Sequence, residues 1–579
     1  MSTFPEQNAE RLQDGAHGPR SAATSDLKKK VAERKKKLQD KKKPPGGFDQ
    51  TPLPDAPPGY TVKFTFHKAE NLPIADLRTS AADPFIHATL TTDTPTRHQE
   101  DPPLTRRTHT LRATTEPVWD EEWIVANVPS SGFTLKCRLY DEDWPDHDDR
   151  LGNVTITERH VDEYWGGFSE RVFDVKKRSG SKRAYLLSGV SSALCRNVSM
   201  TPRLYLSIEV LGRSDPPHGQ MYTVGPTVWI RHFSPMIGRL TGVKVNKDEE
   251  KDAEKGAPTA GDKNDGGTKK YDFQANEIQL SGPVPPKLYH RYVEFRPVIG
   301  MMFSSHGLRG RILNKALHKQ HSRVYNYDSS TEYGSFKPCS EEASLQFLKM
   351  VHFDEGGRVF TYVITLDGMM RFTETGKEFG IDLLSKHTMH SDVATYIACS
   401  GEFFIRRLAH PDASESPQPS EPTHPGDDNL PGGPPKDPPP KDPRHYQLII
   451  DNDSGTYRPD KSVLPDLKGF LERNLPGIGV VAMNCSDDKL VEMKKAQLEA
   501  KKREGPRVKM VLNRSPTGSS FSSDDESRLG DLEHGHDDDV PVRTKKERAF
   551  DVLQNPTQLK GYFGREGEGS KTATAAPAS

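Results

Sequence analysis

The sequence predicts a multidomain protein in which an all-β, antiparallel, eight-stranded sandwich precedes an α+β or α/β domain. The first observation is the alternation of apolar and polar residues in short segments, such as 133–140, which is typical of strands with one buried face. The second is that helical patterns alternate with strand-like runs after residue 270. The third is composition: only 33% of residues are hydrophobic, and Gly and Pro number 46 and 47. This composition predicts disordered termini and insertions around the folded domains.

Eight short segments in residues 58–213 have the length and residue types of strands. They lie at 60–68, 84–91, 107–113, 120–126, 133–140, 151–157, 171–176 and 203–211. Eight such strands suit two packed antiparallel sheets. A further apolar run, Val228 to Ile230 with Phe233, is expected to continue into structure.

The second domain is expected at residues 271–504 and contains both kinds of element. Strands are expected at 350–353, 358–366, 369–373, 394–407, 446–451 and 479–484, and helices at 340–347, 378–385, 463–474 and 487–504. The last helix should end before Gly505-Pro506, because glycine and proline commonly follow a helix.

Four segments are expected to be disordered because they contain few apolar residues. They are residues 1–57, a linker at 244–270, a Pro-rich insertion at 411–444 and a tail at 505–579. Residues 28–43 carry ten Lys or Arg, a pattern that favours anionic membranes but also fits a solvated helix or a nuclear-import segment. No aromatic residues interleave with these lysines, so nucleic acid is not expected as a partner. The insertion would serve as a stiff spacer or as a ligand for a protein partner.

Two loops concentrate acidic residues in the sandwich region. Six carboxylates lie between Asp141 and Asp149, and a loop upstream contains Asp76 and Asp83. The carboxylates of such a loop repel one another unless a cation neutralises them, and carboxylate oxygens are the ligands that calcium and magnesium prefer.

The order of several separated motifs resembles a C2 domain, the membrane-binding sandwich of synaptotagmins and protein kinase C. The motifs are Asp83-Pro84-Phe85-Ile86, then Glu116-Pro117-Val118-Trp119, then Tyr140-Asp141-Glu142-Asp143, with Asp149 before Gly152. The resemblance covers residues 58–213 and implies Ca2+ as the cofactor. Its calcium ligands carry over to Asp76, Asp83, Asp141, Asp143 and Asp149. The first loop is about one residue longer than the family's commonest spacing, so Asp76 has the weakest match to its position in the family's ligand set.

The resemblance also implies a mechanism. Bound calcium would reverse the charge of the loops and leave coordination sites for lipid phosphate oxygens. Leu77 and Trp144 are the candidates for insertion into the membrane interface, although Trp144 would equally pack against its own loop. A basic group near the third strand would contact lipid or form an ordinary exposed face; it comprises Arg106, Arg107, His109 and Arg112.

Other functional classes find less support. No run of 18 apolar residues, signal core or lipidation box is present, and five scattered cysteines fit free thiols in a reducing cytosol. His387 and His390 form a His-x-x-His pair close to Asp392, but the pair lacks a convincing third metal ligand. No known catalytic motif occurs. Ser515 and the serines at 519, 520, 522 and 523 resemble sites that protein kinases phosphorylate. These observations leave open whether the chain is an enzyme, and they favour a non-enzymatic role.

We therefore expect a cytoplasmic, peripheral membrane protein that binds anionic phospholipid membranes in a calcium-dependent manner and acts as an adaptor or targeting protein. Two alternatives stay open. One is an enzyme of unknown reaction in residues 271–504 that the sandwich delivers to a membrane. The other is a calcium-independent scaffold for protein contacts.

Overall fold

The structure is a computed structural model of the 579-residue chain. It describes residues 46–75, 81–99, 101–143, 148–176, 201–233, 274–288, 324–353, 357–374, 397–408, 440–452 and 458–504. Shorter described pieces are 269–270, 307–308, 311–312, 314–315, 321, 390 and 511–512. The predictions for residues 28–43, nearly all of the linker, the helix at 378–385, most of the insertion and nearly all of the tail lie outside the described residues.

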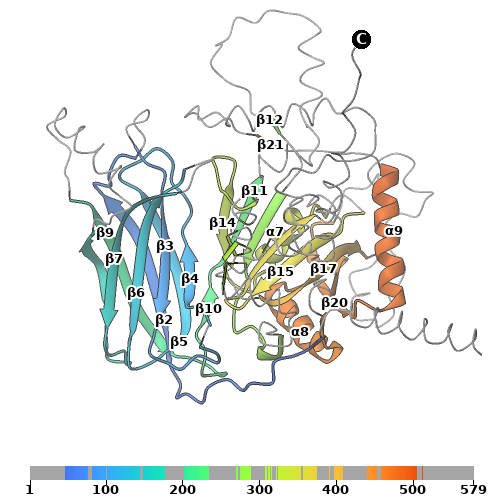
Figure 1. The fold of residues 1–579 in the computed structure, drawn as a ribbon, viewed down its shortest axis with the longest axis horizontal. Coiled ribbons are helices and arrows are strands. Elements are labelled where there is room, and N and C mark those ends of the chain that lie inside the picture. The colour runs from blue at the N-terminus through green and yellow to red at the C-terminus, as the bar shows by residue number, and fades with distance from the viewer. Residues whose placement is uncertain are drawn as a thin grey trace, which may run out of the picture. The chain divides into compact units, whose positions relative to one another are not determined.

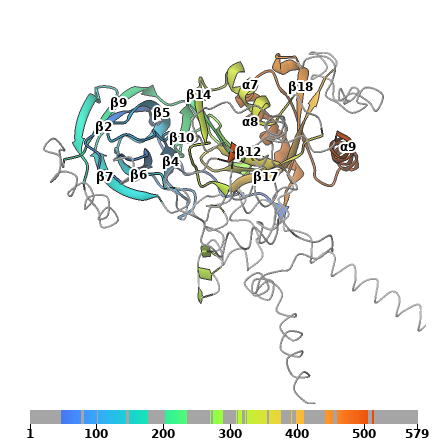
Figure 2. The same ribbon diagram turned by 90° about the horizontal axis from the view of Figure 1, so that it is seen from above.

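Two antiparallel sheets form a sandwich (Figures 1 and 2). One sheet has five strands in the order β10-β5-β2-β9-β8, and the other has four in the order β4-β3-β6-β7. The strands are β2 (Tyr60–Glu70), β3 (Pro84–Thr91), β4 (Leu104–Arg107), β5 (Val118–Val128), β6 (Phe133–Asp141), β7 (Asp149–Glu158), β8 (Phe168–Asp174), β9 (Arg203–Arg213) and β10 (Tyr222–Gly225). The sandwich thus has one strand more than expected, because β10 pairs with the edge of β5.

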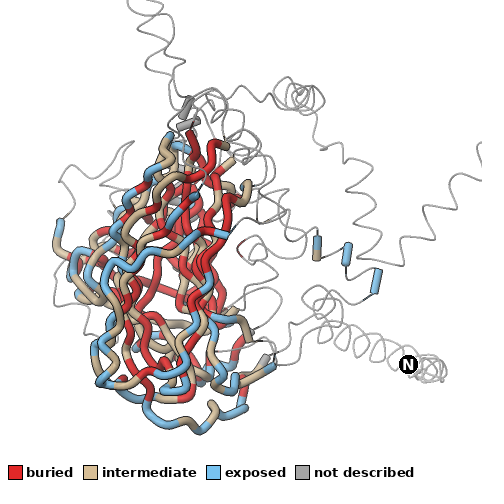
Figure 3. Tube along the Cα trace, turned by 90° about the vertical axis from the view of Figure 1, so that its left-hand side faces the viewer, coloured by how far each residue is buried: buried red, intermediate tan, exposed pale blue. Residues whose placement is uncertain are grey.

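The sandwich core follows directly from the alternating sequence pattern. In β6 every second side chain is buried, from Phe133 to Asp141. The rings of Phe64, Trp123 and Phe133 meet between the sheets, with centroids 5.4 to 5.7 Å apart around Phe64. Figure 3 shows that the buried residues gather in the interior of the described part and that exposed residues lie along its outside. Burial of these apolar side chains is the main force that holds the two sheets together.

One sandwich strand lies earlier in the chain than predicted. A strand was expected at 107–113, but β4 ends at Arg107. The hydroxyl of Thr108 accepts a hydrogen bond from Ile86 N at 2.9 Å, so a side chain replaces a backbone carbonyl in the ladder. Residues 108–114 still run beside β3 through spaced bonds, such as Leu111 N to Pro84 O.

Outside the sandwich, residues 227–483 form an eight-stranded sheet, the second sheet, with strands in the order β14-β11-β13-β16-β15-β17-β18-β20. All neighbours pair antiparallel except β18 and β20, which are parallel. The strands are β11 (Thr227–Phe233), β13 (Gln274–Gln279), β14 (Glu332–Phe336), β15 (Phe360–Thr365), β16 (Met369–Glu374), β17 (Ile397–Arg407), β18 (Tyr446–Asp451) and β20 (Gly479–Met483).

Short elements complete the described fold. The strand β1 (Gly46–Gly47) pairs with β19 (Arg458–Pro459), and β12 (Lys269–Lys270) pairs with β21 (Val511–Leu512). The 3₁₀ helices are η2 (Pro286–Leu288), η6 (Pro443–His445) and η7 (Lys461–Val463).

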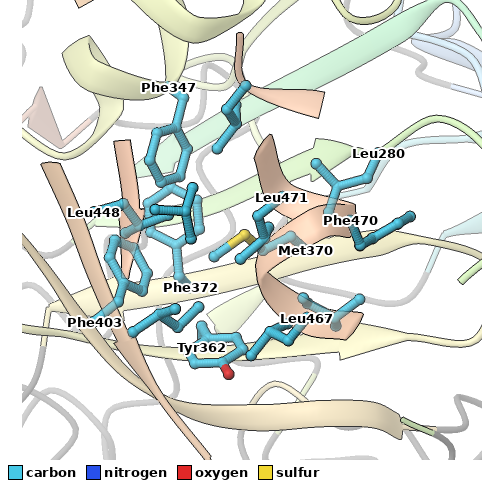
Figure 4. Packing of buried hydrophobic residues seen from close by; sticks show 14 of the residues in the cluster. Leu280, Phe347, Tyr362, Met370, Phe372, Phe403, Leu448, Leu467, Phe470 and Leu471 are labelled. Atoms are coloured by element: carbon cyan, nitrogen blue, oxygen red, sulfur yellow. The ribbon is translucent and has the colours of Figure 1, made fainter. Parts of the chain in front are cut away.

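In the described part of the chain, three α-helices cover the two faces of the second sheet: α7 (Glu341–Met350), α8 (Leu464–Asn474) and α9 (Asp488–Glu504). Phe347 of α7 packs on Phe372 and Phe403 of the sheet, and Leu467 and Phe470 of α8 belong to the same hydrophobic cluster (Figure 4). Leu490 of α9 packs on the opposite face, against Val359, Phe404 and Ile449. Because side chains alternate along a strand, Phe403 and Phe404 belong to different faces.

Most of the predicted elements of the second domain agree with the structure, but one is wrong. The segment 350–353 is not a strand: Met350 ends α7, and the backbone N–H of Val351 still donates to Phe347 O. Phe347, Leu348 and Met350 of α7 and the following Val351 are all buried in the hydrophobic cluster between the helix and the sheet. The apolar residues at 350 and 351 therefore belong to the packed end of the helix. Within the described residues, no helix is both long and apolar enough to span a membrane.

Candidate functional site

The strand register brings three of the predicted metal ligands to one end of the four-stranded sheet. Asp141 lies directly opposite Asp149 in the β6–β7 pair, and Pro84 lies opposite Asp141 in the β3–β6 pair. Asp83 is therefore next to Asp141, and Asp143 follows two residues later. Side chains that face each other across antiparallel strands have Cβ atoms about 5 Å apart. Asp76, Leu77 and Trp144 lie outside the described residues.

Hydrogen bonds hold the first two of these carboxylates. Asp141 is 1% exposed, and its Oδ1 accepts from the backbone N–H of Asp83 at 2.5 Å. The Asp83 carboxylate accepts from Ala113 N at 2.7 Å and from Arg112 Nη1 at 2.9 Å. The two aspartates therefore connect the ends of β3 and β6 as well as carrying charge.

The donor chemistry fits a hard cation, but the described side chains are not arranged around one point. All the candidate ligands offer carboxylate oxygens, which suit calcium. Within the described residues, no three His, Cys, Asp or Glu side chains are placed to hold a metal ion. The guanidinium of Arg112 stands beside Asp83, where a calcium ion would compete with it.

Glu142 has a central place that sequence reasoning missed. It is 6% exposed, and its carboxylate accepts from Arg107 Nη2 and Thr110 Oγ1, each at 2.6 Å, and from Arg112 Nη2. Burial alone would raise the pKa of this carboxyl, but Arg107 and Arg112 hold the pKa below its ordinary value. The available signal was alternation: Glu142 lies between Asp141 and Asp143, so it points to the opposite side.

The four predicted lipid-contacting residues all have partners within the protein. Arg106 points between the sheets and lies 3.7 Å from Glu121 Oε2. His109 Nδ1 also contacts the Glu121 carboxylate. Arg107 and Arg112 bind Glu142, as described above. Lipid contact by these four residues stays a prediction, and for Arg106 it would require a change of side-chain position.

The comparison with protein families supports the sandwich fold described above. Residues 60–166 match the family model of the C2 domain. A C2 domain of a plant extended synaptotagmin 1 is similar at 16% identity and a TM-score of 0.20, over 28% of this chain and all of that one. A three-domain structure of extended synaptotagmin 2 matches at 14% identity and a TM-score of 0.18, over 28% of each chain.

A human cytosolic phospholipase A2, solved with a linolenyl fluorophosphonate, is similar at 17% identity and a TM-score of 0.18. The match covers 30% of this chain and 21% of the phospholipase. The search of curated proteins found no match.

A cavity of about 540 Å³ lies beside Arg107, between the outer face of the C2 four-stranded sheet and the second sheet. The lining on the C2 side includes His87, Arg107 and Arg138, and that on the other side includes Glu277 and Arg371. Burial, assisted by Arg138 and Arg107, lowers the pKa of His87 to about 4. His87 is therefore uncharged at neutral pH, next to two cations.

The histidine cluster predicted as an alternative site is only partly described. His390 is fully buried, its Nδ1 lies 2.6 Å from the Tyr325 hydroxyl, and its Nε2 lies 3.4 Å from Thr373 Oγ1. These contacts explain His390 as a buried polar residue that packs against β16 of the second sheet. His387 and Asp392 lie outside the described residues.

The four described cysteines, Cys137, Cys339, Cys399 and Cys485, are free thiols. Burial raises the pKa of both Cys137 and Cys399 to about 12. These two thiols therefore stay protonated and unreactive in the folded protein.

Proposed function

We propose that this protein binds anionic phospholipid membranes through its C2 domain in a calcium-dependent manner, as a peripheral membrane adaptor or targeting protein. The observation that carries the proposal is the strand register that places Asp83, Asp141 and Asp149 at one end of the sandwich. C2 domains commonly bind phospholipid membranes, many of them with Ca2+, and the match to this family supports the proposal.

The proposed mechanism rests on charge reversal. Without metal, the acidic loops repel an anionic bilayer. Calcium held by Asp76, Asp83, Asp141, Asp143 and Asp149 would neutralise the loops and accept lipid phosphate oxygens as further ligands. In this mechanism Leu77 and Trp144 enter the interface, and the basic segment 28–43 adds electrostatic attraction.

The domain assignment is part of the proposal. We propose residues 58–213 as the membrane-binding domain and 271–504 as a domain with a separate partner or cargo. The cores support this division, because the sandwich residues and the second-sheet residues form different hydrophobic clusters. The strand β11, at 227–233, precedes residue 271 yet pairs with β13, so the second domain would also include it.

The test is sedimentation of the full-length protein with vesicles of phosphatidylserine and phosphatidylcholine, in calcium and in chelator. We expect wild type to pellet only with calcium and the Asp141→Asn/Asp143→Asn variant to stay in the supernatant. Asparagine keeps the Oδ1 acceptor that Asp83 N uses, so the fold should survive. Asp120→Asn, on an exposed position of the other sheet, is the matched control and should behave as wild type.

Other outcomes would favour other functions. Equal pelleting in calcium and chelator would indicate a calcium-independent lipid site. No pelleting in either condition would favour the scaffold function, and attention would move to the Pro-rich insertion 411–444 as a protein-binding segment.

A further inference from the structure

Glu142 attaches the acidic loop to the rest of the molecule. Its backbone N–H donates to Asp83 O at 3.0 Å, so the pairing of β3 and β6 continues one residue beyond Asp141. In this extended backbone, Asp141 and Asp143 share one side and Glu142 takes the other. The three donors that hold Glu142 therefore also determine the direction in which the two aspartates point.

Arg112 connects this anchor to the candidate metal ligands. One of its terminal nitrogens donates to Asp83 Oδ2 at 2.9 Å, and the other contacts the Glu142 carboxylate. Two buried or half-buried carboxylates therefore share one cation. A calcium ion at Asp83 would take over part of this neutralisation, and the pairing between Arg112 and Glu142 would change with it.

Arg107 connects the same anchor to the second sheet. Its Nη2 donates to Glu142, and its Nη1 donates to the Tyr333 hydroxyl at 3.2 Å. Its guanidinium lies over the rings of Phe85, at 3.9 Å, and Tyr327, at 4.8 Å. Tyr333 belongs to β14 and Tyr327 precedes it by six residues, so both lie outside the C2 match.

We propose that Glu142 is a positioning residue of the calcium site, and that Tyr333 of the second sheet and Tyr327, which precedes β14, raise the calcium affinity of the C2 domain through Arg107. The inference rests on the proposed calcium function. The tyrosines hold Arg107 in place, Arg107 holds Glu142, and Glu142 directs Asp141 and Asp143. By linkage, calcium must then stabilise the contact between β14 and the C2 domain by the same factor.

The first experiment is titration calorimetry of calcium into the full-length chain. We expect Tyr327→Leu/Tyr333→Leu to weaken calcium binding about fivefold, the lower end of typical coupling between sites. Tyr333→Phe, which removes only the hydroxyl on Arg107, is the conservative variant and should weaken binding by a smaller factor. Tyr164→Leu is the control: Tyr164 is 90% exposed within the C2 domain, and calcium affinity should not change.

A second measurement covers the reciprocal effect and does not depend on the tyrosine variants being folded. Hydrogen exchange of wild type should be slower in residues 332–336 with calcium than with chelator. In Glu142→Gln this calcium effect should disappear, because an amide side chain cannot pair with both arginines. A merely structural role for Glu142 would speed exchange equally with and without calcium.

The outcomes separate the two proposals. If wild type shows no calcium binding, with heat neither released nor absorbed and no calcium-dependent rise of its thermal midpoint, the proposed calcium function fails and this inference fails with it. If wild type binds calcium but the tyrosine variants bind equally well, and calcium leaves exchange in β14 unchanged, the calcium function stands and the inference is overturned.

Discussion

Glu142 loses the hydration of its carboxylate and gains contacts with two guanidinium groups and a hydroxyl. Removing one partner of a buried charge network leaves the other charges uncompensated, which typically costs about 3 kcal/mol. Glu142→Gln should therefore lower the free energy of unfolding by about 3 kcal/mol in urea titrations. Glu209→Gln, which alters a half-exposed pair with Lys63, should change it by less than about 1 kcal/mol. Equal effects of the two variants would contradict the network.

His87 makes the stability of the protein dependent on pH. Its pKa falls from 6.5 to about 4 because it is buried beside Arg138 and Arg107. Between these pH values the unfolded chain binds a proton that the folded chain does not, so stability decreases as the pH falls. At about 1.4 kcal/mol per pH unit, the loss approaches about 3 kcal/mol near pH 4.

His87→Asn should flatten this dependence, as measured by urea titrations between pH 7 and pH 4.5. His160→Asn, at a position that is 69% exposed, should keep the wild-type slope. A slope in His87→Asn as steep as that of wild type would assign the titration to another group.

At the scale of elements, α9 is joined to the sheet by charge as well as by apolar packing. Lys494 of α9 contacts the carboxylates of Asp451, which is fully buried at the end of β18, and Glu402 of β17. Lys494→Met would remove the ammonium group that these two carboxylates share, and we expect a loss of about 3 kcal/mol of stability. The measurement is urea unfolding monitored by helical circular dichroism.

The neighbouring residue provides a matched control for this prediction. Lys495 is 77% exposed, and its ammonium lies 4.0 Å from Glu499, so Lys495→Met should change stability by about 0.5 kcal/mol at most. Similar losses in both variants would show that α9 depends on helix propensity rather than on the buried ion pairs.

For the whole molecule, the proposed function predicts that calcium stabilises the folded chain. A ligand that binds only the native state at a concentration 100 times its Kd adds about 2.7 kcal/mol to stability. The thermal midpoint of wild type should therefore rise with calcium and not with a chelator. The Asp141→Asn/Asp143→Asn variant should show no rise, and a rise equal to that of wild type would remove these two residues from the ligand set.

The sandwich core and most of the strands could be predicted because their signal is local. Alternation in β6 and the apolar face of α8 are encoded in consecutive residues. The predicted aspartates at Asp83, Asp141 and Asp149 also share one end of the sheet, since an antiparallel register follows from the strand ends. At Thr108 a side-chain hydroxyl replaces a backbone carbonyl in the strand pairing. The local sequence pattern does not reveal this replacement, so the strand was predicted too late in the chain.

The sequence by itself determined most of the segments that form strands and the loops that carry the acidic charge, because both depend on the order of neighbouring residues. Only the tertiary structure decided that Arg107 and Arg112 bind Glu142, and that Tyr333 contacts Arg107 from a separate sheet. These contacts join residues 30 to 226 positions apart. Their partners are selected by packing and by the need to pair buried charge, which no local periodicity records.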